Sequence, residues 1–221
     1  SKKQKRSERG FIMIELKNIS KGFKNKQIFS GITITIETGK CVGIIGENGC
    51  GKSVLMKLIC GFSKPDSGEI IIDGEKLGEH RDFIPNCGVI INSPEFIGHY
   101  TGFENLILLA SIRKQIGKNE ILDVLKKVGL TEAANIKYKS YSLGMKQRLR
   151  LAQAIMETPD YLILDEPMNA LDTEGIAIAD SIIDEYHRLG RTILMTSHNA
   201  NDIERHCDYV LKVDKQSVQC V

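Results

Sequence analysis

Residues 41–60 have the sequence CVGIIGENGCGKSVLMKLIC, and their pattern indicates the class of fold. The first part, 41–45, is short and continuously apolar, which is typical of a strand buried on both faces of a sheet. In the last part, 52–60, Leu55, Leu58 and Ile59 have helical spacing, which predicts a helix. Residues 46–53 satisfy the pattern G-x-x-x-x-G-K-S, so a glycine-rich loop joins the strand directly to the helix.

This loop has the composition that binding of a phosphate group requires. Glycines allow backbone N–H groups to turn inward around an anion, because no Cβ stands in the way. The partial positive charge at the start of the following helix attracts the same anion. We expect Lys52 to reach the β- and γ-phosphates of a nucleotide, and the Ser53 hydroxyl to ligate Mg²⁺. The residues expected to bind the nucleotide here are Gly46, Glu47, Asn48, Gly49, Cys50, Gly51, Lys52, Ser53 and Val54.

A second apolar run, 161–164, ends in two acids, Asp165 and Glu166. Two acids after a strand are usually a solvated turn, but parallel α/β sheets place ligands at the carboxyl ends of their strands. Because a phosphate loop is also present, we expect Asp165 to hold Mg²⁺, directly or through water. Glu166 points elsewhere and is expected to act as the general base that polarises the attacking water.

The remaining hydrophobic pattern predicts an α/β protein with a helical insert around 97–157. Strands are expected at 14–19, 32–36, 41–45, 69–72, 87–91, 161–165 and 192–196, with two short strands after 207. Helices are expected at 52–60, 103–114, 120–128, 143–156 and near 173–188.

The amino-acid composition restricts the classes of protein to which this chain can belong. The chain has 221 residues, of which 42% are hydrophobic and 26% charged, as is ordinary for a soluble globular domain. The net charge is +2, and residues 1–12 alone carry +4, so residues 13–221 carry −2. We expect this basic segment to be a disordered tail or an appended sequence, with Met13 as the natural start. An arm that binds a membrane surface or nucleic acid is the other interpretation. No apolar stretch approaches the ~18 residues of a spanning helix, so we expect no membrane crossing.

The six cysteines form no C-x-x-C pair and lie near no histidine cluster with zinc spacing. We therefore expect reduced thiols, as in a cytosolic protein. Cys50 lies in the phosphate loop, and we expect it to be the cysteine that is alkylated most readily and that MgATP protects. A passive filler of the loop is the alternative for this residue.

Residues 141–148, with the sequence YSLGMKQR, lie at the head of a predicted helix shortly before the two acids. They resemble the signature of ATP-binding-cassette (ABC) proteins, usually L-S-G-G-Q. Residues 169–172 (NALD) resemble the D-loop of that family, and 196–198 (TSH) resemble its switch-histidine segment. Phe23 stands where the family has an aromatic residue that stacks on adenine. The motifs occur in the family's order, and the resemblance covers essentially residues 13–221.

The resemblance implies a P-loop NTPase sheet core with an antiparallel β subdomain and an inserted α-helical subdomain. A single domain over 13–221 would contain a catalytic core, about 13–96 and 158–221, and a helical subdomain, about 97–157.

The resemblance also implies the chemistry, which is ATP hydrolysis with ATP and Mg²⁺ as cofactors. The catalytic residues would be Glu166, Lys52 and His198, the last contacting the γ-phosphate and the attacking water. Two copies, or this chain and a related cassette, would form a head-to-tail dimer around two ATP molecules. Ser142 and Gly144 would then contact the γ-phosphate held by the partner's P-loop. A separate transmembrane permease would hold the dimer at the cytoplasmic face of the cell membrane.

Three positions depart from the usual family pattern. Leu143 replaces the first glycine of the signature, and Met145 replaces its glutamine. These changes resemble the bacitracin-resistance and lantibiotic-immunity exporter branch, which suggests export of an antimicrobial peptide or drug. Asn92 stands where the family has a glutamine that reaches Mg²⁺ and couples to the membrane subunit. Asparagine keeps the amide oxygen but is one methylene shorter, so its contact with the metal is left open here.

Two other classes of protein compete with a transporter subunit. A soluble ABC ATPase acting on nucleic acid or ribosomes usually has two cassettes in one chain or long coiled coils between its motifs, and neither occurs here. A nucleotide kinase would have no use for the signature or for His198. We expect no nucleic-acid partner.

Overall fold

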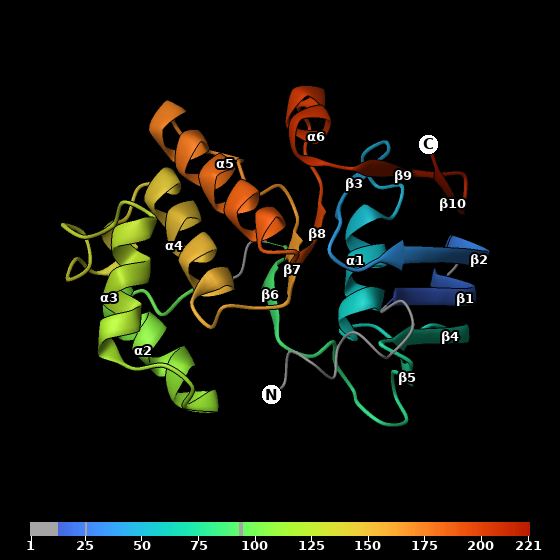
Figure 1. Ribbon diagram of the computed structural model, residues 1–221, viewed down its shortest axis with the longest axis horizontal. Helices are drawn as coiled ribbons and strands as arrows, with labels where there is room; N and C mark the ends of the chain where they lie inside the picture. Colours follow the sequence, from blue (N-terminus) through green and yellow to red (C-terminus); the bar gives the residue numbers. More distant parts are fainter. Residues whose placement is uncertain (1–12, 25, 93–94) are drawn as a thin grey trace.

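The computed structural model describes residues 13–24, 26–92 and 95–221. The basic segment 1–12, and with it the expected tail, lies outside the described residues. The described chain contains two sheets and a group of helices on one side of the larger sheet (Figure 1).

The smaller sheet is antiparallel, with strand order β2-β1-β4-β5. Its strands are β1 (Met13–Phe23), β2 (Lys26–Glu37), β4 (Ser67–Ile72) and β5 (Glu75–Lys76). In β2, Ile32, Ile34 and Ile36 are buried while their neighbours are exposed, so one face of this sheet meets the core and the other meets water.

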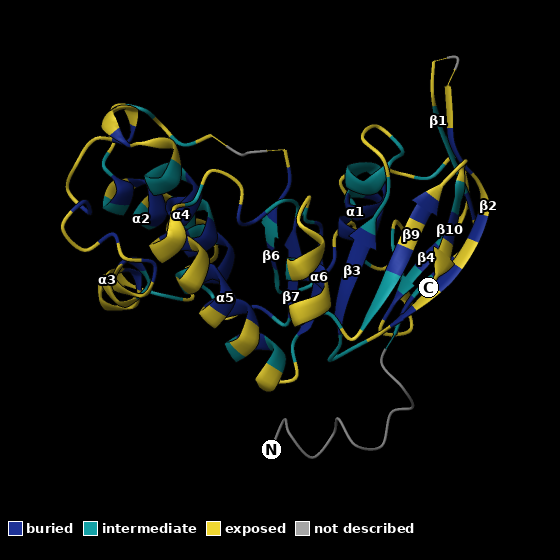
Figure 2. Ribbon diagram, turned by 90° about the horizontal axis from the view of Figure 1, so that it is seen from above, coloured by how far each residue is buried: buried dark blue, intermediate teal, exposed yellow. Residues whose placement is uncertain are grey.

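The larger sheet has the order β10-β9-β3-β8-β7-β6, and neighbouring strands from β9 to β6 are parallel. Its strands are β3 (Cys41–Ile45), β6 (Cys87–Ile90), β7 (Tyr161–Leu164), β8 (Thr192–Met195), β9 (Tyr209–Asp214) and β10 (Ser217–Cys220). All residues of β7 and β8 are buried, because helices or the second sheet cover both faces (Figure 2).

Helix α1 (Lys52–Cys60) lies between the two sheets, and its buried side chains join β1, β2 and β3 in one apolar cluster. The opposite face of the larger sheet is covered by a second cluster that includes the helical insert. The helices there are α2 (Gly102–Arg113), α3 (Lys118–Lys127), α4 (Leu143–Ile155), α5 (Thr173–Arg188) and α6 (Ala200–His206). Within the described parts of the chain, no helix has the length and apolar character needed to cross a bilayer.

Most elements lie within three residues of the expected ranges, and α1 and α5 have the expected bounds. The expected strand 14–19 is too short, because β1 continues through register shifts to Phe23. The expected strand 32–36 is too short as well, because β2 begins at Lys26, where it pairs with the extended end of β1. Helix α6, strand β5 and a 3₁₀ turn (Tyr138–Ser140) were not expected. These elements are too short to carry a readable hydrophobic period.

Candidate active site

Three loops meet at one edge of the larger sheet. The glycine-rich loop follows β3, the acids Asp165 and Glu166 follow β7, and Thr196–His198 follow β8, which lies between those two strands. Because these strands are parallel, their carboxyl ends lie together, which is the usual position of a ligand in this class of sheet. The sequence motifs therefore converge in space although they are far apart in the chain; Ser53 and Asp165, for example, are separated by 112 positions.

The glycine-rich loop requires glycine at two positions for steric reasons. Gly46 has φ +150, and a Cβ there would lie 2.4 Å from the Val213 carbonyl oxygen. Gly51 has φ +119 and forms the N-cap of α1 without a side-chain hydrogen bond to the helix. The first N–H groups of α1 therefore receive no capping side chain and can donate to a phosphate.

Lys52 folds back over the loop. Its Nζ atom donates to the carbonyl oxygens of Gly46 at 2.7 Å and Glu47 at 3.1 Å. This geometry places a positive charge above the ring of backbone amides, where it would face the phosphates of a bound nucleotide.

Ser53 and Asp165, the two residues expected to hold the metal, lie in contact. The Ser53 hydroxyl donates to Asp165 Oδ2 at 2.6 Å. Hydroxyl and carboxylate oxygens are ligands that Mg²⁺ prefers, with waters and nucleotide phosphates completing its octahedron. No cluster of three or more His, Cys, Asp or Glu able to hold a metal occurs in the residues that the structure describes, so these two side chains fit Mg²⁺ only together with a nucleotide.

Glu166 and His198 lie side by side. The His198 backbone N–H donates to Glu166 Oε2 at 3.1 Å, and His198 Nε2 lies 3.4 Å from Glu166 Oε1. The Glu166 side chain is 21% exposed and that of His198 is 64% exposed, so water can reach both. Glu166 has φ +53, an uncommon conformation for a residue with a side chain, and such strain is concentrated at functional sites.

Two adjoining hollows surround these groups. One, of about 310 Å³, is lined by Ile28, Asn48, Gly49, Gly51, Lys52, Ser53, Val54, Asp165, Glu166 and His198. The other, of about 250 Å³, shares Asp165 and Glu166 and extends to Leu143 and Gln147 of α4. The expected catalytic residues and most of the expected phosphate-binding residues thus line one continuous region, whereas Gly46, Glu47 and Cys50 line neither hollow.

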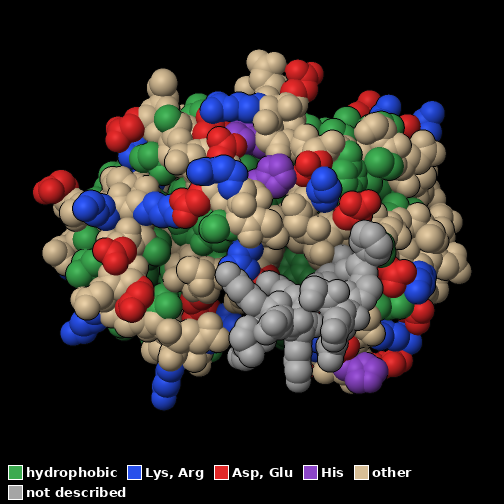
Figure 3. Space-filling view, in the orientation of Figure 1, with side chains coloured by type: hydrophobic (Ala, Val, Ile, Leu, Met, Phe, Trp, Pro, Cys, Tyr) green, Lys and Arg blue, Asp and Glu red, His purple; other side chains and the backbone are tan. Residues whose placement is uncertain are grey.

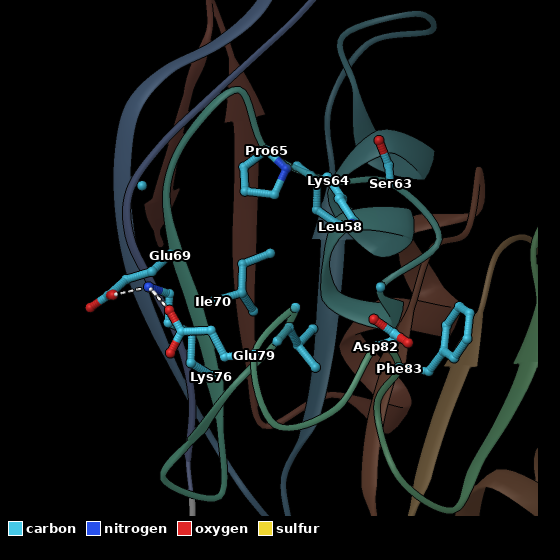
Figure 4. Close-up of a pocket in the computed structure, with 14 residues that line it drawn as sticks. Leu58, Ser63, Lys64, Pro65, Glu69, Ile70, Lys76, Glu79, Asp82 and Phe83 are labelled. Atoms are coloured by element: carbon cyan, nitrogen blue, oxygen red, sulfur yellow. Dashed lines mark ion pairs between the residues drawn. The ribbon is translucent and has the colours of Figure 1, made fainter.

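A larger hollow of about 380 Å³ lies elsewhere, between the end of α1 and strand β4 (Figure 4). Leu58, Ile70 and Phe83 contribute apolar surface, while Lys76 is neutralised by Glu69 and Glu79. It shares no residue with the hollow at the glycine-rich loop and offers no comparable phosphate cradle, so it is not the nucleotide site.

Comparison with known proteins identifies the family. A family model described as ABC transporter matches residues 29–169. An uncharacterised ABC transporter ATP-binding protein of Bacillus subtilis (strain 168) is 40% identical over 202 residues, covering 91% of this chain and 93% of that protein. This chain belongs to the ABC transporter family. It is an ATP-binding subunit with ATPase activity, as the sequence motifs predict.

A further relative and a solved structure are also similar to this ABC subunit. The bacitracin transport ATP-binding protein of Enterococcus faecalis is 36% identical, with 90% of this chain and 65% of that protein covered. A solved structure described as the ATP-binding subunit of an ABC transporter is 26% identical with a TM-score of 0.83, covering 93% of this chain and 88% of that one. The P-loop NTPase core with its antiparallel and helical subdomains is therefore confirmed.

The signature stretch of this ABC subunit lies at the start of α4. Ser142 caps the helix, with its hydroxyl accepting the Met145 N–H at 3.1 Å, and Leu143 beside it is 72% exposed. Neither Ser142 nor Gly144 lines the hollow at the chain's own P-loop. Strands of the larger sheet separate α4 from α1 (Figures 1 and 2).

Two expected site residues lie at the margin. Phe23 ends β1 at the hairpin, is 49% exposed, and has Lys21 Nζ 5.1 Å from its ring centroid. Asn92 is exposed, with φ +54, and neither it nor Phe23 lines the two hollows of the active site. Adenine stacking on Phe23 and a metal contact by Asn92 therefore stay predictions.

Sequence reasoning missed two residues that hold Glu166. Gln147 is buried on α4, and its Nε2 donates to the backbone oxygens of Glu166 at 3.2 Å and Pro167 at 2.9 Å. Thr196 is fully buried at the end of β8 and hydrogen-bonds to both acids. A polar residue inside an apolar pattern was the available signal in each case, but the partners are 19 and about 30 positions away in sequence.

Proposed function

We propose that this subunit binds and hydrolyses MgATP as one half of a dimer and thereby powers export through a separate membrane subunit. The observation that carries the proposal is the juxtaposition of the P-loop, Asp165, Glu166 and His198 at one sheet edge, with Ser142 and Gly144 of the signature outside the hollow at this P-loop. In this reaction Lys52 and the loop amides bind the phosphates, and Ser53 and Asp165 hold Mg²⁺. Glu166 accepts a proton from the attacking water, and His198 orients Glu166 and the γ-phosphate.

The positions of Ser142 and Gly144 support the dimer. Both residues lie outside the hollow at their own P-loop, which favours a role at the nucleotide of another subunit. There, the amides at the start of α4 meet the γ-phosphate, so ATP joins the two subunits and hydrolysis releases them. Phe23 stacks on adenine, and Asn92 reaches toward the metal and the permease.

The exported substrate is an antimicrobial peptide or drug. Support comes from the similarity to the bacitracin transport ATP-binding protein, and from a lantibiotic transport ATP-binding protein of Streptococcus pyogenes that is 34% identical, with 90% of this chain and 85% of that protein covered. The subunit then works at the cytoplasmic face of the membrane. A nucleic-acid partner has no comparable support, because on the face in Figure 3 basic side chains alternate with acidic ones.

Mixing two inactive variants tests the composite site. Ser142→Arg places a bulky side chain at the signature, and Lys52→Ala removes the phosphate contact. Each variant alone should lose ATP-driven dimerisation and most ATPase activity. A mixed dimer has one intact site and one doubly damaged site, so mixing should restore part of the ATPase activity. Full activity of Ser142→Arg alone at low protein concentration would refute the composite site.

The membrane partner is tested by capture of this subunit from detergent-solubilised membranes. A hydrophobic subunit should be retained with it. Salt-sensitive retention of nucleic acid instead would favour a translation- or DNA-associated ATPase.

A further inference from the structure

We propose that Thr196 is a positioning residue that orients both carboxylates of the active site. The inference rests on the proposed function, because that assigns Mg²⁺ to Asp165 and the general base to Glu166. Thr196 lies at the carboxyl end of β8, between the P-loop strand β3 and the acid-bearing strand β7. Its side chain reaches no nucleotide-facing surface, since the residue is 0% exposed.

The Thr196 hydroxyl joins the two acids. It donates its hydrogen to Asp165 Oδ1 at 2.8 Å, and it accepts the backbone N–H of Glu166 at 2.9 Å. The Thr196 backbone N–H also donates to the Leu164 oxygen at 3.0 Å, which fixes the start of this segment against β7. A single hydroxyl thus sets the side chain of one acid and the backbone of the other.

The consequence for Asp165 is a fixed orientation. Its Oδ1 is held by Thr196, and its Oδ2 accepts the Ser53 hydroxyl at 2.6 Å. A carboxylate bound on one oxygen presents the other to the metal position beside Ser53. Groups that support a metal ligand in this way set its direction and the affinity for the ion.

The consequence for Glu166 concerns its backbone. Its φ of +53 is disfavoured for a residue with a Cβ and persists only where the surroundings hold it. The N–H is held by Thr196 and the C=O by Gln147, so contacts from β8 and α4 fix the peptide on both sides. Displacement of a catalytic group by about 1 Å can cost ~10²-fold in rate.

Substitutions that differ in hydrogen bonding can distinguish the positioning role of Thr196 from a role in packing. Valine has the shape of threonine but neither donates nor accepts a hydrogen bond, whereas serine does both and lacks only the methyl group. Thr192 provides a matched control on the same strand, because it is 2% exposed and its Oγ1 accepts the Gly39 N–H at 2.9 Å. It lies at the opposite end of β8 from the acids.

The experiment measures steady-state ATPase kinetics and thermal unfolding of the full chain and of three variants. We expect Thr196→Val to lower kcat by about 10- to 100-fold and to raise KM for MgATP only several-fold, because the P-loop still binds the phosphates while the contact of Asp165 with the metal weakens. Thr196→Ser should restore kcat to within about 3-fold of the parent. Thr192→Val should lower the unfolding midpoint but leave kcat unchanged. A Thr196→Val kcat within about 2-fold of the parent, or an equal loss in Thr196→Ser, would overturn the proposal.

A second measurement needs no turnover. In a Glu166→Gln background with ATP present, binding of Mn²⁺ followed by electron paramagnetic resonance reports on the metal position. Adding Thr196→Val should weaken Mn²⁺ binding several-fold, and adding Thr196→Ser or Thr192→Val should not. Unchanged Mn²⁺ binding in Thr196→Val would contradict the role at Asp165. Failure of the parent and of Glu166→Gln to bind MnATP would instead refute the proposed function itself.

Discussion

Replacement of Gln147 by methionine tests whether α4 stabilises the active site through the Glu166–Pro167 backbone. Methionine has a similar length and volume but cannot donate a hydrogen bond, so the substitution removes the amide contacts and little packing. The Glu166 oxygen keeps the Asn169 N–H at 3.2 Å, so losing Gln147 there should cost about 1 kcal/mol. The Pro167 oxygen loses its donor in a buried position, which costs about 1–3 kcal/mol.

These two losses sum to about 2–4 kcal/mol in the free energy of unfolding. Arg150 also loses its 3.0 Å hydrogen bond to Gln147 Oε1, but it is half-buried, so water can replace this contact at little cost. For a chain of this size, each kcal/mol lowers the unfolding midpoint by roughly 2–4 °C, so the expected decrease is roughly 4–16 °C. Thermal unfolding without nucleotide, followed by circular dichroism, measures it. Gln153→Met on the half-buried side of the same helix is the matched control and should change the midpoint by less than about 2 °C. A decrease in Gln147→Met no larger than in this control would refute the reasoning.

Three further substitutions or treatments test the site itself. Glu166→Gln should keep ATP binding, lose about 10²–10⁴-fold in hydrolysis rate and trap an ATP-bound dimer, whereas near-normal turnover would show that Glu166 is not the base. Cys50 lies in the P-loop, and Cys220 is exposed far from it in sequence. MgATP should therefore reduce maleimide labelling of Cys50, measured by mass spectrometry, and leave the labelling of Cys220 unchanged. Equal protection of both cysteines would count against Cys50 as a reporter of the P-loop. Gly46→Ala should abolish nucleotide binding measured by fluorescence titration, because its Cβ would clash with the Val213 oxygen, while Gly74→Ala, where no atom lies within 4 Å of the Cβ position, should bind normally.

The long, strongly patterned elements were predictable from sequence because their burial follows their periodicity. Strand β3 and helix α1 have the expected bounds, and the loop between them has the conformation that its glycines require. The pairing of Ser53 with Asp165 was also predictable, since parallel strands bring their carboxyl ends to one edge. At these positions the local hydrophobic pattern and the order of the strands lead to the same prediction.

The supporting contacts of the site were not predictable in the same way. Thr196 follows the apolar strand β8, and Gln147 lies in the middle of a helix, so each is a polar residue in an apolar pattern that indicates a buried polar contact but not its partner. Each acts through a hydrogen bond to a residue on another element, and the register that aligns those elements is set by tertiary packing. A partner set by packing leaves no mark in the local period of the chain.

Helix α4 connects the signature residue Ser142 to the proposed general base Glu166. Ser142 caps its exposed end, and Gln147, five positions later and thus about 7.5 Å along the axis, holds the Glu166 carbonyl. Arg148 on the next position donates to Asp172 at 2.7 Å, and this contact holds the pKa of the Asp172 carboxyl below its ordinary value. In the proposed dimer, a nucleotide held by the partner at Ser142 would press on a helix that already contacts both the Glu166 backbone and Asp172. If α4 moves as a body, all of these contacts are displaced together and Glu166 shifts when the other site is occupied. If only the residues near Ser142 move, Glu166 stays in place, so the position of Glu166 distinguishes the two cases.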